Sequence, residues 1–250
     1  RDLVRSRGLG DVYKRQAAKR SDRSMDQFYN HDDKEAEKKK TQYTTFEDAG
    51  CFTGFSVREE GNNVVVTANY KLGCFDQAVW TISPDGTAAI DFTYNFSGVV
   101  DLMGVMFDYP EDKVLSKRWV GDGPYRVWQN RLHGPQLGVW ENEYNDPIPA
   151  ESFTYPEFKG YFANVQWMTL ETQEGMISIC NRTPQNYVGV YQPRDGRDGL
   201  LYTFPVTGIS LMKVIPPVRN KVNTTDLIGP SSQAFWADGE YGGGITLKFE

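Results

Sequence analysis

From residue 46 onward the sequence alternates apolar and polar residues with a period of two, and turn-forming residues interrupt this pattern at short intervals. The alternation is clearest in residues 63–72, 78–82, 88–94, 165–170, 176–179, 211–214 and 244–249. Because successive side chains of an extended chain point to opposite faces, each segment is predicted to be a β-strand. Convincing helical periodicity is absent from this region. The fold class predicted is all-β, with strands in a large antiparallel sandwich or barrel.

Short segments rich in Gly, Pro, Asn and Asp predict the turns between these strands. The sequence Ser-Pro-Asp-Gly at 83–86 predicts a hairpin, because Pro presets φ and Gly accepts a positive φ. The dipeptides Gly61-Asn62 and Glu174-Gly175 are interpreted in the same way. Three consecutive glycines at 242–244 are also expected to form a turn, directly before the last strand.

Charge and composition divide the chain near residue 45. Residues 1–45 contain twelve basic and eight acidic side chains and no Trp or Pro. The remainder contains 15 basic and 25 acidic side chains, all six Trp and all 13 Pro. Two different kinds of polypeptide are therefore expected on the two sides of this boundary.

The first part is divided further by its sequence. Residues 1–16 (RDLVRSRGLGDVYKRQ) lack the apolar region and small-residue cleavage site of a secretory signal. They resemble translated sequencing-adaptor DNA, so we expect a non-native leader and a missing N-terminal part; a basic arm that binds an anionic partner is the alternative. Residues 17–45 are interpreted as a charged linker, or as a surface helix supported by a Glu35–Lys39 pair. Residues 46–250 are predicted to form the β domain.

Composition also excludes several functions. The net charge of −6 argues against nucleic acid as a partner, and no run of about 18 apolar residues predicts a membrane span. Three widely spaced cysteines, without a C-x-x-C motif, argue against zinc; three buried thiols are expected, with one disulfide plus a free thiol as the alternative. Only His31 and His133 could serve a histidine metal site or a Ser-His-Asp triad. We expect no metal and no cofactor.

The most distinctive segment runs from Trp119 to Leu170 and includes WVGDGPYRVWQNR at 119–131. Gly121-x-Gly123-Pro124 predicts a tight turn at the end of a strand. Residues 128–131 (Trp-Gln-Asn-Arg) place an aromatic ring beside an amide and a guanidinium, which suit sugar hydroxyls. The alternative is that Trp and Arg beside a turn pack and cap the local structure.

This segment resembles the C-terminal domain of β-galactosidases of glycoside hydrolase family 2, also known as the small-chain or fifth domain. That family carries a W-x-G-x-G-P-x-E-N-Y-x-D-R motif. The residues that match this motif directly are Trp119, Gly121, Gly123, Pro124 and Arg131, with Trp128 at its Tyr, Asn130 at its Asp, and Arg126 and Val127 in place of its Glu and Asn. Later matches are Gly138-Val139-Trp140, Tyr155-Pro156-Glu157, Gly160 and Val165-x-Trp167. The resemblance covers residues 46–250, although Asp101 to Val105 depart from the family's Leu-Pro-Arg-hydrophobic-Gly sequence.

The resemblance implies an antiparallel β-supersandwich of the galactose-mutarotase-like type, in which two large sheets stack face to face. In that family the C-terminal domain completes the wall of an active site whose two catalytic glutamates belong to an upstream TIM barrel. Such a barrel needs about 250 residues of alternating strands and helices, which this sequence lacks. We therefore expect no catalytic residue in this chain. Its acidic side chains, including Glu141, Glu143, Asp146 and Glu157, are expected at the surface or in turns.

The resemblance also implies an aromatic side chain near the C-terminus that stacks on the substrate. The substrate-binding residues predicted are Trp236, with Phe235 as the second choice, Ser232, Gln233, Asn130 and Arg131. For Trp236 the alternative is a structural role in capping the final hairpin.

The leading hypothesis is the C-terminal domain of a β-galactosidase-like retaining glycoside hydrolase that hydrolyses terminal β-linked sugars and is inactive as this fragment alone. Its expected partners are a carbohydrate substrate and the upstream catalytic domains of the same polypeptide. Assembly into an oligomer is an open alternative. A free-standing carbohydrate-binding β-sandwich without catalytic activity is the main alternative. A mutarotase-like enzyme is a third hypothesis, in which His133 would be the acid.

Overall fold

The computed structural model describes residues 14–18, 43–45, 51–100, 102–107, 109, 113–143, 160–190, 209–215 and 235–250, with the first two ranges described by their backbone alone. Every named element in these ranges is a β-strand, and the strands form two antiparallel sheets. The all-β, antiparallel prediction is therefore confirmed. Within the described residues, no helix is long and apolar enough to cross a membrane.

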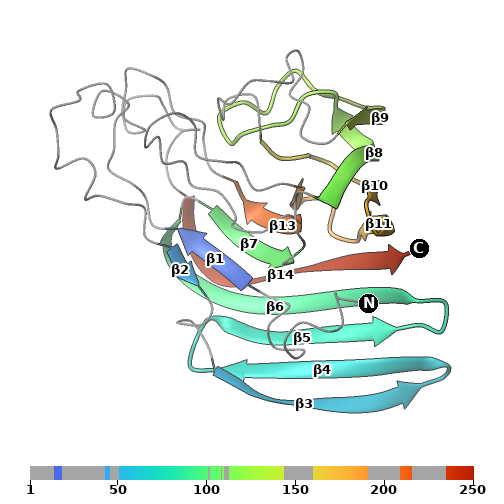
Figure 1. The fold of residues 1–250 in the computed structure, drawn as a ribbon. Helices are drawn as coiled ribbons and strands as arrows, with labels where there is room; N and C mark the ends of the chain where they lie inside the picture. The colour runs from blue at the N-terminus through green and yellow to red at the C-terminus, as the bar shows by residue number, and fades with distance from the viewer. Residues whose placement is uncertain are drawn as a thin grey trace, which may run out of the picture.

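The larger sheet has nine strands. In spatial order they are β3 (Cys51–Glu60), β4 (Asn63–Lys71), β5 (Phe75–Ile82), β6 (Thr87–Val100), β14 (Phe235–Phe249), β11 (Gly175–Asn181), β10 (Trp167–Thr172), β8 (Val114–Gly123) and β9 (Gln136–Glu143). The first four strands follow the chain as a meander, whereas β14 joins the end of the sequence to the middle of the sheet (Figure 1). The longest pairing is that of β6 with β14, from Val100–Phe235 to Thr87–Lys248.

The smaller sheet has five strands. Their spatial order is β12 (Tyr187–Gly189), β13 (Ile209–Val214), β7 (Leu102–Phe107), β1 (Lys14–Ala18) and β2 (Tyr43–Thr45). Strand β7 follows β6 after a single residue, so the chain passes directly from one sheet to the other at this point.

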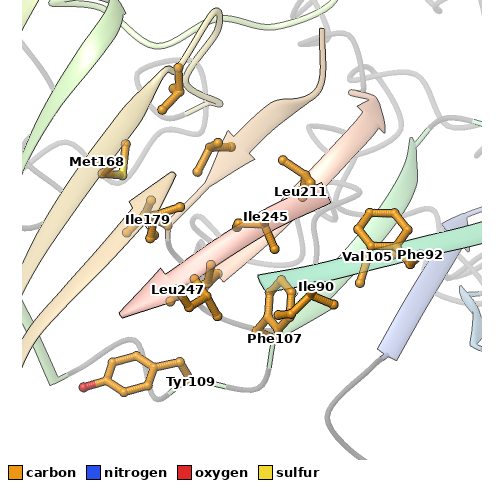
Figure 2. Close-up of a cluster of buried hydrophobic side chains, with 14 of the residues drawn as sticks. Ile90, Phe92, Val105, Phe107, Tyr109, Met168, Ile179, Leu211, Ile245 and Leu247 are labelled. Carbon is orange, nitrogen blue, oxygen red and sulfur yellow. The ribbon is translucent and has the colours of Figure 1, made fainter. Parts of the chain in front are cut away.

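The hydrophobic core lies between the two sheets. Val105, Phe107 and Leu211 from the smaller sheet are buried in one cluster with side chains of the larger sheet, among them Ile90 and Ile245 (Figure 2). Because these residues are at alternate strand positions, each sheet directs its apolar face toward the other. In β10, for example, Met168 and Leu170 are fully buried while Trp167 is 37% exposed. We call the side of the larger sheet that carries Met168 and Leu170 its inner face and the opposite side its outer face.

The inner face remains apolar beyond the region where the core buries it. Phe55, Val57, Val64 and Ile82 on β3, β4 and β5 are 57%, 55%, 39% and 39% exposed. Cross-strand pairing aligns them with inner-face residues, since Phe55 is opposite the buried Ala68 and Val57 is opposite the buried Val66. We refer to these four side chains as the β3–β5 apolar surface.

The predicted turns at 61–62, 83–86 and 174–175 are present. Gly61, Gly86 and Gly175 all have positive φ, and the Gly86 N–H donates to the Ser83 carbonyl oxygen at 3.0 Å. The turn predicted for the three glycines at 242–244 is wrong, because all three lie inside β14. A Cβ at Gly243 would be 2.7 Å from the Phe92 ring, and one at Gly244 would be 2.7 Å from Asp91 Oδ1, so the glycines allow close packing within the sheet.

The strand β1 crosses the boundary that we predicted between residues 16 and 17. Its backbone pairs with β2 on one side and with β7 on the other, from Lys14–Met106 to Ala18–Leu102. Residues 17, 18 and 43–45 of the predicted linker are therefore strand residues. The division into a leader, a linker and a domain of residues 46–250 stays a prediction.

The prediction of three buried thiols is wrong. Cys51 and Cys180 are free thiols exposed at the surface, and Cys74 is partly exposed. Cys180 lies on the outer face of β11, directly opposite Trp167 of β10, where the sheet alternation directs side chains to the surface.

Candidate functional site

The motif that carries the family resemblance forms a packed corner of the larger sheet. Trp119 is fully buried, its ring centroid is 4.8 Å from that of Phe162, and its indole N–H donates to the Asp122 carbonyl oxygen at 3.0 Å. A Cβ at Gly121 would be 3.0 Å from the Ala163 carbonyl oxygen and Val165 Cα. These residues therefore hold β8 against residues 163–165.

Trp128 does not supply the exposed aromatic ring that the sequence suggested. Its side chain is 2% exposed and packs edge-on to Tyr161, with ring centroids 5.9 Å apart. A Cβ at Gly160 would be 3.2 Å from the Trp128 indole nitrogen and 2.5 Å from the Val127 carbonyl oxygen. The alternative interpretation, in which this Trp packs beside a turn, is the one that the structure bears out.

Asn130 and Arg131 lie in the connection between β8 and β9. The Arg131 N–H donates to the Trp128 carbonyl oxygen at 2.8 Å, which closes a tight turn over 128–131. Asn130 is partly exposed and Arg131 is exposed. The buried Trp128 thus anchors a turn that presents an amide and a guanidinium at the surface.

Phe235 and Trp236 are the first two residues of β14. Beyond the Tyr94–Tyr241 pair, β6 and β14 continue as a ribbon of residues 95–100 and 235–240, in which each strand has the other as its partner among the described strands (Figure 1). Trp236 is nine residues along β14 from Ile245, where pairing with β11 begins, or roughly 30 Å along the strand. Its side chain is 66% exposed, whereas Phe235 packs against the core.

The structure brings the predicted substrate-binding residues together only in adjacent pairs. Asn130 and Arg131 share one turn, and Phe235 and Trp236 share one strand end, so the pairs lie on different elements. Ser232 and Gln233 lie outside the described residues. Of the predicted surface carboxylates, Glu141 and Glu143 are exposed on β9, and Asp146 and Glu157 also lie outside the described residues.

Sequence reasoning did not find the groove on the outer face of the larger sheet. This open hollow has a volume of about 780 Å³ and lies over β9, β8, β10 and the turn that leads into β11. Its lining residues are Ser116, Arg118, Glu141, Trp167, Thr169, Glu171, Thr172, Gly175, Met176 and Glu250. A usable signal was present, because the alternation that buries Met168 and Leu170 directs Trp167, Thr169 and Glu171 to the opposite face.

The described ranges contain no group of three or more His, Cys, Asp or Glu side chains placed to hold a metal ion. His133, the residue on which a mutarotase-like mechanism depends, is exposed in the connection between β8 and β9.

The beta galactosidase small chain family matches residues 11–208 of this chain. Galactose 1-epimerase from Lactobacillus acidophilus NCFM is similar in structure, with 9% sequence identity, a TM-score of 0.40, and coverage of 78% of this chain and 65% of that one. A GalM/aldose epimerase homologue from C. elegans is also similar, with 9% identity, a TM-score of 0.33, and coverage of 78% and 68%. No curated protein sequence matches significantly.

The family match spans 198 of the 250 residues and includes the Trp119–Arg131 motif, so the resemblance inferred from that motif is confirmed. The same match begins at residue 11 and contains strand β1, ahead of the domain boundary predicted at residue 46. The chain belongs to the beta galactosidase small chain family, whose members are domains of β-galactosidases, which are glycoside hydrolases.

Proposed function

We propose that this chain is the C-terminal, non-catalytic part of a β-galactosidase-like retaining glycoside hydrolase that acts on terminal β-linked sugars. The observation that carries the proposal is the family match over residues 11–208. In this proposal the chain completes the wall of an active site, and the nucleophile and the acid/base belong to catalytic domains with which it assembles.

The placement of the carboxylates supports a catalytic pair outside this chain. A retaining glycosidase needs two carboxyl groups about 5–5.5 Å apart. In the outer-face groove, Glu141 on β9 and Glu171 on β10 are separated by the whole of β8. Two strand spacings put them about 10 Å apart even before their different positions along the strands are counted.

Trp236 is the residue that we propose to contact the substrate from this chain. It is 66% exposed, yet its neighbours fix its position, because Ala237 is fully buried and Phe235 packs against the core. Trp side chains combine a large apolar surface with low conformational entropy, which suits stacking on a sugar ring. Ser232 and Gln233, directly before this strand, and Asn130 and Arg131 are proposed to supply hydrogen bonds.

The β3–β5 apolar surface is proposed to contact the catalytic domains. Phe55 and Val57 are more than half exposed although they lie on the apolar face of a sheet. Contiguous exposed apolar side chains are typical of a surface that another protein surface covers. Among the described strands β3 is at the edge of the larger sheet, a position at which a strand can pair with another chain.

The test is to assemble the full chain with a β-galactosidase catalytic chain and to measure hydrolysis of a nitrophenyl β-galactoside. With the small chain at saturating concentration, Trp236→Ala is expected to lower kcat/KM by about tenfold or more, and Trp236→Phe by less, because a ring is kept. Equal kcat/KM for Trp236→Ala and the unsubstituted chain would remove Trp236 from the site. Failure of the full chain to assemble with or activate any catalytic chain would contradict the proposal itself.

A further inference from the structure

The groove on the outer face combines one exposed indole with several hydrogen-bonding side chains on the same face of the sheet. We propose that this groove binds a neutral oligosaccharide chain, with Trp167 as the apolar platform and Arg118, Glu141, Thr169 and Glu171 as hydrogen-bonding partners. The proposal does not rest on the function proposed above, because it needs neither a catalytic chain nor Trp236.

Strand pairing arranges the outer-face side chains in three parallel rows across β9, β8, β10 and β11. The first row is Val139, Val120, Trp167 and Cys180; the second is Glu141, Arg118, Thr169 and Ser178; the third is Glu143, Ser116, Glu171 and Met176. Neighbouring strands are about 4.8 Å apart, and successive rows, two residues apart along each strand, are about 7 Å apart. An apolar row thus runs directly beside a polar row, and both are accessible from the same side.

This juxtaposition matches the two-sided chemistry of a sugar. A pyranose has C–H groups that pack on an aromatic ring and hydroxyl groups that both donate and accept hydrogen bonds. Trp167 is 37% exposed in the first row. Beside it, the Arg118 guanidinium can donate two parallel hydrogen bonds and the Glu141 carboxylate can accept two. Arg118 forms no ion pair with any residue that the structure describes, so its donors face the groove uncommitted to a carboxylate.

The charge of the groove selects a neutral ligand. Glu141 and Glu171 outnumber Arg118, while Glu250 is paired with Lys248 at 2.6 Å. One oxygen of Glu171 accepts a hydrogen bond from the Ser116 hydroxyl at 2.9 Å, which fixes that carboxylate in the polar lining. The groove therefore has a net negative charge, which would repel an anionic chain. Polyuronates and nucleic acids are disfavoured as ligands for this reason.

The sheet geometry favours a glycan over an extended peptide. An added peptide strand needs an exposed sheet edge with unpaired N–H and C=O groups. The groove instead lies over β8 and β10, which are paired on both sides, β8 with β9 and β10, and β10 with β8 and β11. Recognition must therefore use side chains alone, which is how aromatic and polar groups on a sheet face can hold a sugar chain.

The binding test is affinity electrophoresis of the full chain in native gels that contain neutral β-1,4-galactan, with polygalacturonate gels in parallel. Galactan is expected to retard the chain, and Trp167→Ala to weaken this retardation at least tenfold in apparent Kd. Trp167→Phe should retain most of the retardation, which separates loss of the platform from loss of the fold. The control Leu72→Ala changes a side chain that is 90% exposed in the β4–β5 connection and should bind like the unsubstituted chain.

Two exposed thiols give an independent readout of where the glycan lies. Cys180 is directly opposite Trp167, whereas Cys51 is on the edge strand β3 at the far side of the same sheet. Bound galacto-oligosaccharide is expected to slow alkylation of Cys180 severalfold and to leave Cys51 unchanged, as measured by peptide mass mapping.

Several outcomes would overturn the proposal. Retardation that survives in Trp167→Ala places the sugar elsewhere on the chain, and equal protection of both cysteines shows a general effect. Retardation by polygalacturonate alone contradicts the assigned charge preference. Protection of Cys180 by a basic peptide, without any effect of galactan or galacto-oligosaccharide, makes the groove a protein-docking surface. Because no catalytic chain is present in these assays, their failure leaves the function proposed above untouched.

Discussion

The indole N–H of Trp140 on β9 donates to the carbonyl oxygen of Gly121, near the end of β8, at 3.2 Å. This side-chain hydrogen bond adds to the backbone pairing of the two strands. The ring lies so close to β8 that a Cβ at Gly123 would be 2.5 Å from its Cδ1 atom. Gly123 of the family motif is therefore explained by packing, because it leaves the space that this ring occupies. In this corner Trp119, Gly121 and Gly123 of the motif have a packing role.

Gly123→Ala is expected to destabilise the chain by about 1–3 kcal/mol, because the added methyl group overlaps Trp140. Urea unfolding of the full chain measures the loss. If overlap with the Trp140 ring is the cause, Gly123→Ala should lower the free energy of unfolding much less in a Trp140→Ala background. The two substitutions should then show a coupling free energy of about 0.5 kcal/mol or more. Gly61→Asn is the control, since Gly61 has φ 63 with nothing within 4 Å, and Asn tolerates that conformation. An equal cost of Gly123→Ala in both backgrounds would refute this explanation.

Asp85 makes the β5–β6 hairpin turn sensitive to pH. The backbone N–H of Thr87, and then its hydroxyl group, donate to the Asp85 carboxylate at 3.1 and 3.0 Å and hold its pKa below the ordinary value. A lowered folded-state pKa contributes stability above the unfolded pKa of about 3.9, and that stability is lost as the pH falls through the folded value. Asp85→Asn should therefore lower Tm at pH 7 and have a smaller effect at about pH 2.5, which is below the unfolded-state pKa of about 3.9. The same Tm difference at both pH values would show that ionisation has no part in it.

The β3–β5 apolar surface can be tested apart from stability. Because Phe55 and Val57 are more than half exposed, Phe55→Lys and Val57→Lys together should change Tm of the chain by only a few degrees. The same pair should weaken assembly with a catalytic chain at least tenfold, as measured by sedimentation velocity. Leu72→Lys, at a 90% exposed position, is the matched control and should assemble normally. Unimpaired assembly of the double variant would mean that the partner binds another surface.

Local sequence signals predicted the strands and tight turns well because their causes are local. The turn at 83–86 was predicted from Pro84 and Gly86, which lie within it, and alternation within one segment is enough to identify β4 or β10. The turn predicted at the glycines 242–244 was wrong for a nonlocal reason. The atoms that occupy the space of their missing side chains belong to Phe92, Asp91 and Asn186, which are far away in sequence.

The functional residues were less predictable because sheet order decides which side chains become neighbours. The rows of the outer-face groove exist only because β10 pairs with β8 and not with its sequence neighbour β9. Likewise, Trp128 and Trp236 both follow a Gly-Pro dipeptide in the sequence, yet one is 2% and the other 66% exposed. Burial of Trp128 depends on Tyr161, which arrives from a distant segment.

The most direct test of the central claim is the hydrolysis rate of the purified full chain at high concentration, with a nitrophenyl β-galactoside as substrate. No turnover is expected from the chain alone, and turnover is expected when a catalytic chain is added. Saturable hydrolysis by the chain alone, at a rate proportional to its concentration and unchanged through further purification, would contradict this claim.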